Sequence, residues 1–422
     1  MELFLKNIGK IGEASIKING ITVIAGENNT GKSTVGKVLY CLFSAFHNIN
    51  DKIEEERRQS VHRTLRRPAI GGYTSIINSQ RLSKKICDNR KQYTEDIDAL
   101  KDILKKTYKS FDSLGESAGD DDVETIFNKV LSYLKLDDDT IKANVLKKIF
   151  VSEYNMQIGN VNSEETSSSI RLTIQGENSI DIEIEDNESV NIRSSIDIDS
   201  NVAYIEDPFV LDELTDRYSF FVAHTGNHRE KLIEMLVQKR GSSIVSSVIE
   251  EMVVSERLTH ILDVLNQPCE GILVKAEDSY AYTTSKYTKP LALSNISTGL
   301  KTFLILKTLL LNGAIEERGI IILDEPEIHL HPEWQLLFAE IIVLLQKEFD
   351  LHILLNTHSP YFLRAIQVYS AQYEIADTCK YYLSEEKGEQ ASITDVSECI
   401  DKIYAKLSRP LQSLEDERWQ ND

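Results

Sequence analysis

The feature that most constrains this chain is a glycine-containing loop between an apolar run and a helical pattern. Its residues are Gly26, Glu27, Asn28, Asn29, Thr30, Gly31, Lys32, Ser33 and Thr34. The loop follows the apolar run Ile21–Ala25, which is typical of a buried strand, and it precedes a helical pattern. This context favours a phosphate-binding loop over an ordinary glycine turn. In such a loop backbone N–H groups face phosphate oxygens, Lys32 reaches the β- and γ-phosphates, and Ser33 contributes a ligand to Mg²⁺. This segment, the phosphate loop, predicts a Walker A nucleotide site.

A second apolar strand pattern ends in two carboxylates. The run Ile320–Leu323 is followed directly by Asp324 and Glu325. Phosphoryl transfer needs charge neutralisation and an aligned nucleophile, so we expect Asp324 to hold the Mg²⁺ shell and Glu325 to orient or deprotonate water. Taken without the phosphate loop, the same residues would be a strand end with an acidic turn.

A histidine follows a third strand pattern. The run Leu351–Asn356 precedes Thr357 and His358. A histidine at the carboxyl end of a strand can hydrogen-bond a γ-phosphate and respond to its loss, and we assign that role to His358. A single histidine is more commonly structural, so this assignment depends on the two preceding motifs.

The fourth pattern is a polar segment that opens an apolar helix. Ser297, Thr298 and Gly299 precede the helical run TFLILKTLLLNGA, and the N–H groups of such a helix start form an anion site. In isolation this pattern would be an ordinary helix cap.

In their order along the chain, the four patterns resemble the ABC-type ATPase head shared by SMC-type, RecF-like and OLD-like proteins. The resemblance covers residues 1–48, 201–210 and 290–366, and it implies an α/β fold with a mixed or parallel sheet. Within that superfamily, the run Glu325–Pro332 and the Thr-His-Ser-Pro segment are similar to bacterial AAA-type ATPases of phage defence, nearest the ATPase subunit of Septu-like systems. The chain departs from the family pattern at two places. In the signature, which Ser297, Thr298 and Gly299 match, the next residues are Leu300 and Lys301. Glu206 and Asp207 stand where such heads commonly carry a magnesium-contacting glutamine, so that glutamine is left unassigned.

The resemblance also implies how the site works. Its cofactors are ATP and Mg²⁺, and the expected enzyme is a slow, switch-like ATPase. Ser297, Thr298 and Gly299 of one head would complete the site formed by the phosphate loop and Glu325 of another, in a homodimer or higher homo-oligomer. ATP binding would then fasten two heads, and hydrolysis would release them.

The expected organisation has six segments. They are 1–48, the first part of the head; 49–155, a charged helical insertion; 156–200, a small β element; 201–289, a helical linking region; 290–366, the second part of the head; and 367–422, a tail that could dock a partner. No sustained heptads are visible in the sequence, so a long coiled coil is not expected.

Charge limits the possible partners. The net charge of −20 argues against a protein that coats DNA, because nonspecific binding depends on cationic contacts to phosphate. A local cationic cluster is nevertheless present, formed by Arg57, Arg58, Arg63, Arg66 and Arg67. It is either a helical face paired with nearby acids or a patch that contacts DNA or RNA phosphates.

Other candidate sites have a structural explanation beside the functional one. Glu327, His329 and His331 could suggest a metal cluster, but a structural or interface loop is the better interpretation, and the spacing of His224 and His228 gives no zinc site. An apolar stripe at helical spacing either packs on the chain's own core or docks a second subunit. Its members are Val396, Ile400, Ile403, Tyr404 and Leu407.

The compartment and the function follow as expectations. Cysteines without a disulfide or zinc pattern, and the lack of an apolar leader or spanning run, predict a cytoplasmic protein that does not enter a membrane. We expect a sensor and scaffold ATPase of an antiphage complex that controls a separate nuclease or toxin, because no Toprim-like unit follows His358. The alternative is a RecF-like DNA-binding ATPase of repair or recombination, while a GTPase and a transporter ATPase fit the motifs less well.

Overall fold

The computed structural model describes most of the chain. The described residues are 1–66, 72–112, 120–155, 157–174, 176, 178–187, 189–194, 196–214, 226–238, 248–276 and 279–421. They form two compact units, of which the first comprises Met1–His47 and Leu146–Asp422, and the second comprises Asn48–Val145. No described helix is both long enough and apolar enough to cross a bilayer.

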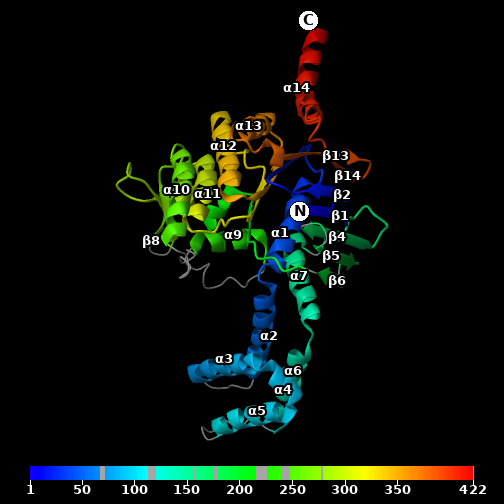
Figure 1. Cartoon of the computed structure of the whole chain (residues 1–422), viewed down its shortest axis with the longest axis vertical. Coiled ribbons are helices and arrows are strands. Elements are labelled where there is room, and N and C mark those ends of the chain that lie inside the picture. Colours follow the sequence, from blue (N-terminus) through cyan, green and yellow to red (C-terminus); the bar gives the residue numbers. More distant parts are fainter. Residues whose placement is uncertain are drawn as a thin grey trace. The chain divides into compact units, whose positions relative to one another are not determined.

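The first unit is built on an eleven-stranded mixed sheet (Figure 1). Its strands run in the spatial order β6-β5-β4-β1-β2-β14-β13-β3-β12-β11-β7. Their bounds are β1 Glu2–Ile8, β2 Ile11–Lys17, β3 Ile21–Gly26, β4 Ser167–Ile174, β5 Asn178–Glu185, β6 Ser189–Ser194, β7 Val202–Ile205, β11 Ile320–Asp324, β12 His352–Thr357, β13 Lys380–Lys387 and β14 Gln390–Asp395. The predicted α/β head with a mixed sheet is thus confirmed.

The strands that precede the predicted nucleotide residues lie side by side. β3 pairs with β12, and β12 pairs with β11, in parallel register. Every residue of β3 and β11 is buried, as expected for central strands covered on both faces. Because parallel strands end at the same edge, the loops after β3, β11 and β12 meet there.

Helices cover both faces of this parallel part. The helices of the first unit are α1 Lys32–Phe46, the end of α7 Asp138–Tyr154, α9 His228–Val237, α10 Val248–Leu265, α11 Thr298–Leu311, α12 Pro332–Phe349, α13 Pro360–Gln372 and α14 Asp401–Asn421. Alternate strand residues such as Val23, Ile321 and Leu355 enter one large core with Phe303 and Phe338 of the helices α11 and α12, which Figure 1 shows beside each other. On the opposite face, α1 approaches β11 closely, since a Cβ on Gly36 would lie 3.0 Å from Ile322.

The prediction of a separate small β element over residues 156–200 is wrong. Strands do form in residues 156–200, but β4 pairs with β1, so β4, β5 and β6 extend the main sheet. Without β4, the backbone groups along that side of β1 would be left unpaired, and an added strand satisfies them. The separate small sheet is instead formed by β8 Ile272–Ala276, β9 Ser279–Thr283 and β10 Leu291–Ala292.

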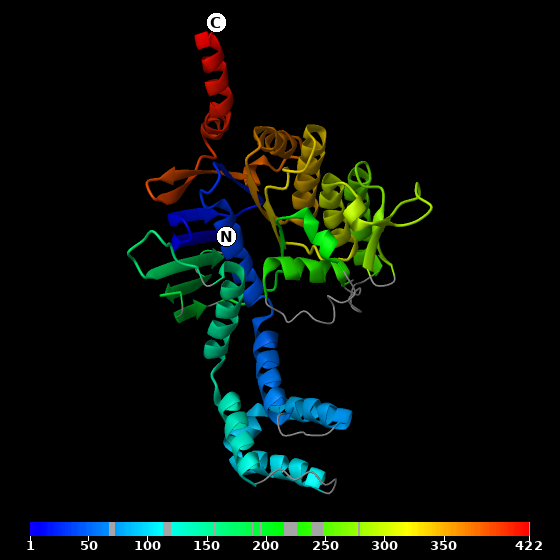
Figure 2. The same ribbon diagram turned by 180° about the vertical axis from the view of Figure 1, so that it is seen from behind.

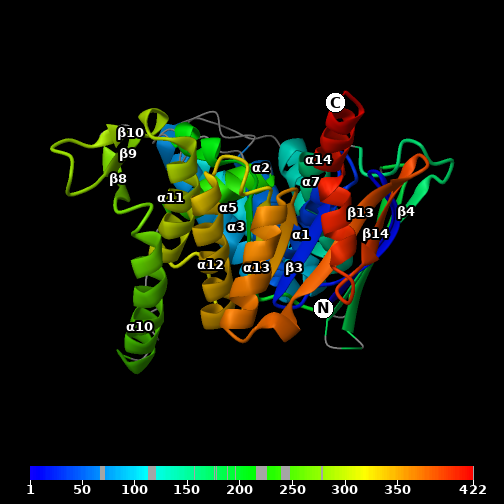
Figure 3. The same ribbon diagram turned by 90° about the horizontal axis from the view of Figure 1, so that it is seen from above.

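The C-terminal segment is part of the head rather than a tail. β13 pairs with β3, and β14 pairs with β2, so this hairpin joins the two halves of the sheet, as Figures 2 and 3 show from behind and from above. The apolar stripe packs on the chain's own core: Val396 and Ile403 are buried in it, and Ile400, Tyr404 and Leu407 pack against it. This packing agrees with the first of the two explanations for the stripe, and docking of a second subunit stays untested.

The second unit is helical, as predicted. Its helices are α2 Ile49–Arg66, α3 Gly72–Asp88, α4 Arg90–Glu95, α5 Ile97–Asp112, α6 Asp120–Lys135 and the first part of α7. They enclose a core of their own that includes Val61, Leu100, Phe127 and Leu134. The unit ends at Val145, so the last turns of α7 belong to the first unit rather than to the insertion expected over 49–155.

Candidate functional site

The phosphate loop joins β3 to α1 at the carboxyl edge of the sheet. Gly31 has φ 83°, a left-handed conformation that glycine adopts at little cost, and α1 begins at the next residue. Gly26 meets a different limit, because a Cβ there would lie 2.0 Å from the carbonyl oxygen of Ser384 in β13. Each glycine of the motif therefore has its own physical reason.

Lys32 is the buried cation of this loop. Its side chain is buried, and its Nζ donates to the carbonyl oxygen of Glu27 at 2.7 Å. Burial lowers the pKa of Lys32, while the nearby carboxylates of Glu325 and Asp324 act in the opposite direction. Lys32 is thus near enough to the carboxylates at the end of β11 for their charge to act on it.

Asp324 is fixed by two neighbours that sequence reasoning missed. Tyr204 of β7 donates to its Oδ2 at 3.0 Å, and the Asn356 amide of β12 donates to its Oδ1 at 2.9 Å. Both partners are fully or almost fully buried. The signal for Asn356 was present in the sequence, because a buried strand that ends in an amide requires a hydrogen-bond partner.

Glu325 adopts an uncommon backbone conformation. Its φ is 49°, in the left-handed region that a residue with a Cβ rarely adopts, and its N–H donates to the carbonyl oxygen of Asn356 at 3.0 Å. Its Oε1 lies 2.6 Å from His358 Nε2. This close contact, together with Lys32, lowers the pKa of the Glu325 carboxyl. The Glu325 carboxyl therefore lies at ion-pair distance from the imidazole, although His358 Nε2 has no partner with hydrogen-bond geometry among the described residues.

The signature residues lie at the start of α11. Ser297 caps this helix and accepts from the N–H of Leu300, and Gly299 packs closely, since a Cβ there would lie 3.2 Å from the Trp334 ring. Within the described ranges, no hydrogen bond or ion pair joins Ser297, Thr298 or Gly299 to the phosphate loop. The structure thus unites Lys32, Asp324, Glu325 and His358, but leaves the signature residues without such a bond to them.

The two departures from the family pattern have structural explanations. Lys301 is buried, and its Nζ pairs with both carboxylate oxygens of Asp212 at 2.6 and 2.7 Å. Glu206 Oε2 contacts His228 Nε2 at 2.9 Å, and Asp207 contacts Arg229 at 3.2 Å. These acids are therefore paired with cations within the chain.

A buried histidine lies behind the carboxylates. Besides Glu206, His228 contacts Glu153 Oε1 through Nδ1 at 2.7 Å, and its ring stacks on Tyr204 with centroids 4.3 Å apart. Burial opposes the charged form, but the hydrogen bonds to Glu153 and Glu206 outweigh it and raise the pKa of His228 to about 9. No zinc site is predicted for His224 and His228, and His224 lies outside the described residues.

Residues Glu327, His329 and His331 belong to the loop between β11 and α12. Glu327 bonds to residues that follow β12, His329 packs edge-on against the ring of Phe209, and His331 caps α12 by accepting from the N–H of Glu333. Each side chain thus has a role within the loop, which agrees with its interpretation as a structural segment.

The arginine cluster does not form one cationic surface. Arg57 is buried and donates to Asp138 at 2.6 Å and to main-chain carbonyls such as that of Leu136. Arg58 pairs with Glu55 on the same helix, and Arg63 donates to Gln59. Arg63 and Arg66 are exposed, and Arg67 lies outside the described residues. Arg57 therefore stabilises the helical unit and is removed from the proposed nucleic-acid patch.

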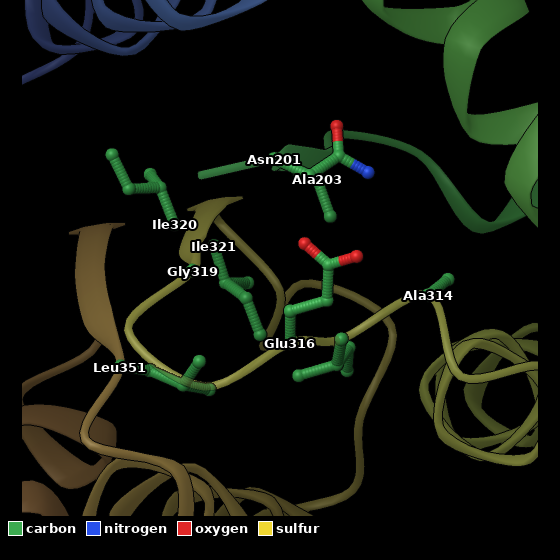
Figure 4. Close-up of a pocket in the computed structure, with 9 residues that line it drawn as sticks. Asn201, Ala203, Ala314, Glu316, Gly319, Ile320, Ile321 and Leu351 are labelled. Carbon is green, nitrogen blue, oxygen red and sulfur yellow. The ribbon is translucent and has the colours of Figure 1, made fainter. Parts of the chain in front are cut away.

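A small pocket lies near the starts of β7 and β11 (Figure 4). It is lined by Asn201, Ala203, Ala314, Ile315, Glu316, Gly319, Ile320, Ile321 and Leu351. These residues include the starts of β7 and β11, whereas the phosphate loop and Glu325 follow strand ends. The pocket is thus separate from the predicted nucleotide chemistry.

The residues of the site have the chemistry needed to bind a nucleoside triphosphate together with a divalent cation. Lys32 supplies a buried positive charge, and it follows Gly31, which has a left-handed backbone conformation. The N–H groups of the phosphate loop and of the start of α1 are donors of the kind that bind phosphate. Ser33 and Asp324 supply the hydroxyl and carboxylate oxygens that Mg²⁺ prefers. The arrangement places a buried cation after β3 and two carboxylates after β11, with β12 between these strands.

The chain is similar in sequence or in fold to several known proteins. The chain is 21% identical over 432 residues to the "Retron Vc95 probable ATPase" of Vibrio cholerae serotype O1 biovar El Tor, covering 90% of this chain and 77% of the relative. Among solved structures, the SMC head domain from Thermotoga maritima gives a TM-score of 0.41 with 11% identity and covers 94% of this chain and 98% of its own. An ABC transporter ATP-binding cassette in its ADP conformation gives 0.36 with 11% identity, covering 97% and 96%.

The family comparison covers most of the sequence. Residues 21–364 match the family described as "AAA domain, putative AbiEii toxin, Type IV TA system". The matched range includes the phosphate loop, the Asp324 and Glu325 pair, and His358. The chain therefore belongs to this AAA-domain family.

Proposed function

We propose that this protein is an ATPase that acts as sensor and scaffold of an antiphage defence complex and controls a separate nuclease or toxin. The observation that carries the ATPase proposal is the contact of Glu325 with His358, beside Lys32, at the ends of adjacent parallel strands. The defence role is supported by the family description, which refers to a toxin, and by the retron ATPase among the relatives. The Septu-like assignment stays a prediction.

In this proposal Glu325 and His358 have linked roles. The lowered pKa keeps Glu325 ionised, so its carboxylate can orient water and accept a proton from it. In this structure the imidazole of His358 lies against the Glu325 carboxylate. A bound γ-phosphate would offer that imidazole a competing partner. Mg²⁺, bound by Ser33 and Asp324, would neutralise charge on the transferred phosphoryl group. Lys32 would bind the β- and γ-phosphates.

The signature residues are proposed to act in a second copy. The N–H groups at the start of α11, next to Ser297, Thr298 and Gly299, would bind the γ-phosphate held by the phosphate loop of the partner head. This role is supported by the exposure of Ser297 at the start of α11, because the first N–H groups of a helix have no partner within it. ATP would therefore join two heads, and its hydrolysis would separate them.

The experiment is affinity purification of the chain from its native cell, followed by mass spectrometry and a nucleic-acid assay. Three forms are compared: the parent, Glu325→Gln, and Lys32→Ala, which removes the buried cation of the phosphate loop. We expect a stoichiometric nuclease or toxin whose retention differs between Glu325→Gln and Lys32→Ala, because these variants favour different nucleotide states.

Two results would contradict the defence proposal. A partner that is not a nuclease or toxin would remove the effector assignment. Retained DNA without a protein partner would favour the RecF-like alternative, for which the exposed Arg63 and Arg66 are the remaining cationic candidates of the cluster on the described part of α2.

A further inference from the structure

A third carboxylate, Glu327, lies buried beside the Glu325 and His358 pair. Its side chain is only 4% exposed. Its Oε1 accepts from the hydroxyl of Thr357, from the N–H of His358 at 3.0 Å and from the N–H of Ser359 at 3.2 Å. We call these three donor residues the switch loop. One oxygen atom thus binds every residue of the loop that carries the imidazole.

Glu327 is itself held in place. Its carbonyl oxygen accepts from the N–H of Leu330 at 3.0 Å and from the amide of Gln335 at 3.4 Å. The amide oxygen of Gln335 accepts in turn from the Ser359 hydroxyl at 2.9 Å. The switch loop is therefore connected to the loop after β11 through Glu327 and to α12 through Gln335, and Glu327 forms the larger connection.

We propose that Glu327 is a positioning residue that fixes the switch loop so that His358 faces Glu325. The contact of His358 Nε2 with Glu325 at 2.6 Å requires the main chain at His358 to be placed accurately. Removing the acceptor would leave the N–H of His358 and the hydroxyl of Thr357 without it, a cost that the loop can avoid by moving. The N–H of Ser359 would keep only its second acceptor, Thr357 Oγ1 at 3.0 Å. The inference deepens the proposed function, since it gives Glu327 a role in the same site.

The bonding of Glu327 is asymmetric, and this decides which substitutions test it. Its Oε2 is buried and has no hydrogen-bond partner among the described residues, so Oε1 makes all the side-chain contacts. Glutamine keeps a carbonyl oxygen as acceptor, and its NH₂ group replaces the atom without a partner. Leucine keeps a similar bulk but has no acceptor. The proposal therefore predicts that Glu327→Gln preserves the switch loop and Glu327→Leu releases it.

The test observes the imidazole of His358 in the protein without nucleotide. Histidine ring nitrogens are labelled with ¹⁵N, and His358→Asn identifies the NMR signal of His358. Glu325→Ala shows where this signal moves when its carboxylate partner is removed. We expect Glu327→Leu to move the signal toward that position and Glu327→Gln to leave it near the parent position. Glu333→Leu, which removes an exposed acid of α12, is the matched control.

Thermal melting establishes which variants are folded. If Glu327→Leu is unfolded, Glu327→Asp replaces it, because a side chain shorter by one methylene cannot reach all three donors. The proposal is contradicted if a folded Leu or Asp variant keeps the parent signal, or if Glu327→Gln moves the signal as far as they do.

Kinetics provide a second measurement. For Glu327→Leu we expect kcat to fall about tenfold or more while KM for ATP changes less than about threefold, because Glu327 acts through His358 and not on substrate binding. Glu327→Gln should recover most of kcat. The NMR result does not depend on hydrolysis or on an effector, so failure of the proposed function would leave the positioning role testable by itself.

Discussion

At the scale of single residues, His228 shows how partners can reverse the effect of burial. Glu153 and Glu206 contact its two ring nitrogens and keep the buried imidazole protonated, with its pKa raised to about 9. Lys37 Nζ, 3.8 Å from Glu153, is a further cation near this cluster. Because the unfolded pKa of histidine is about 6.5, the folded state binds a proton more tightly.

This difference predicts how stability depends on pH. The contribution of His228 is fully present below about pH 6.5 and is lost as the pH rises through about 9, with a limit of about 3 kcal/mol. Urea unfolding from pH 6.5 to 9.5 should show a decline for the parent that is reduced in His228→Gln. His260→Gln, which removes an exposed histidine, should keep the parent profile. Equal declines in parent and His228→Gln would exclude this role.

At the scale of elements, α14 contacts the phosphate loop. Lys406 of this helix is 3.2 Å from Glu27 of the loop and 3.5 Å from Glu385 of β13. Its ammonium therefore compensates two carboxylates next to a predicted polyanion site. The contact joins the C-terminal segment to the candidate nucleotide site, a connection that the sequence did not indicate.

Removing this ammonium should weaken ATP binding. In Lys406→Met, the carboxylate of Glu27 loses its cation near the phosphates, and we expect a two- to fivefold increase in Kd, consistent with about 0.4–1 kcal/mol for a partly exposed pair. Adding Glu27→Gln should restore affinity. Lys402→Met, on the same helix, is the control. Fluorescent-nucleotide titration at two salt concentrations measures each Kd, and an unchanged Kd for Lys406→Met would refute the effect.

Some strands could be predicted from the sequence and others could not, and the difference has a physical cause. β3, β11 and β12 are continuous apolar runs followed by chemically distinctive residues, so both the strands and the predicted site residues at their ends could be identified. β13 and β14 were missed, because their exposed polar ends hide the alternation and their partners β3 and β2 are distant in sequence. The Glu327 contact with the switch loop was missed for the same reason, since it joins two strand ends.

At the scale of the whole molecule, the central expectation is that ATP joins two copies. If Ser297 of one head completes the site of another, a variant that binds but does not hydrolyse ATP should accumulate as a dimer or larger assembly. Light scattering after size exclusion should show Glu325→Gln at twice the monomer mass or more with ATP and Mg²⁺, and as smaller species without them. Lys32→Ala should not respond to ATP. A mass of Glu325→Gln that is independent of nucleotide would contradict assembly through the heads.

The most direct test of the account is phosphate release by the purified chain with ATP and Mg²⁺, measured alongside ATP binding. The parent should release phosphate slowly, Glu325→Gln should bind ATP but release at least about tenfold less phosphate, and Lys32→Ala should fail to bind. This result would establish a nucleotide site in which Lys32 binds phosphates and Glu325 activates water. Phosphate release by Glu325→Gln at the parental rate would contradict the assignment of Glu325, and ATP binding by Lys32→Ala at parental affinity would contradict the site itself.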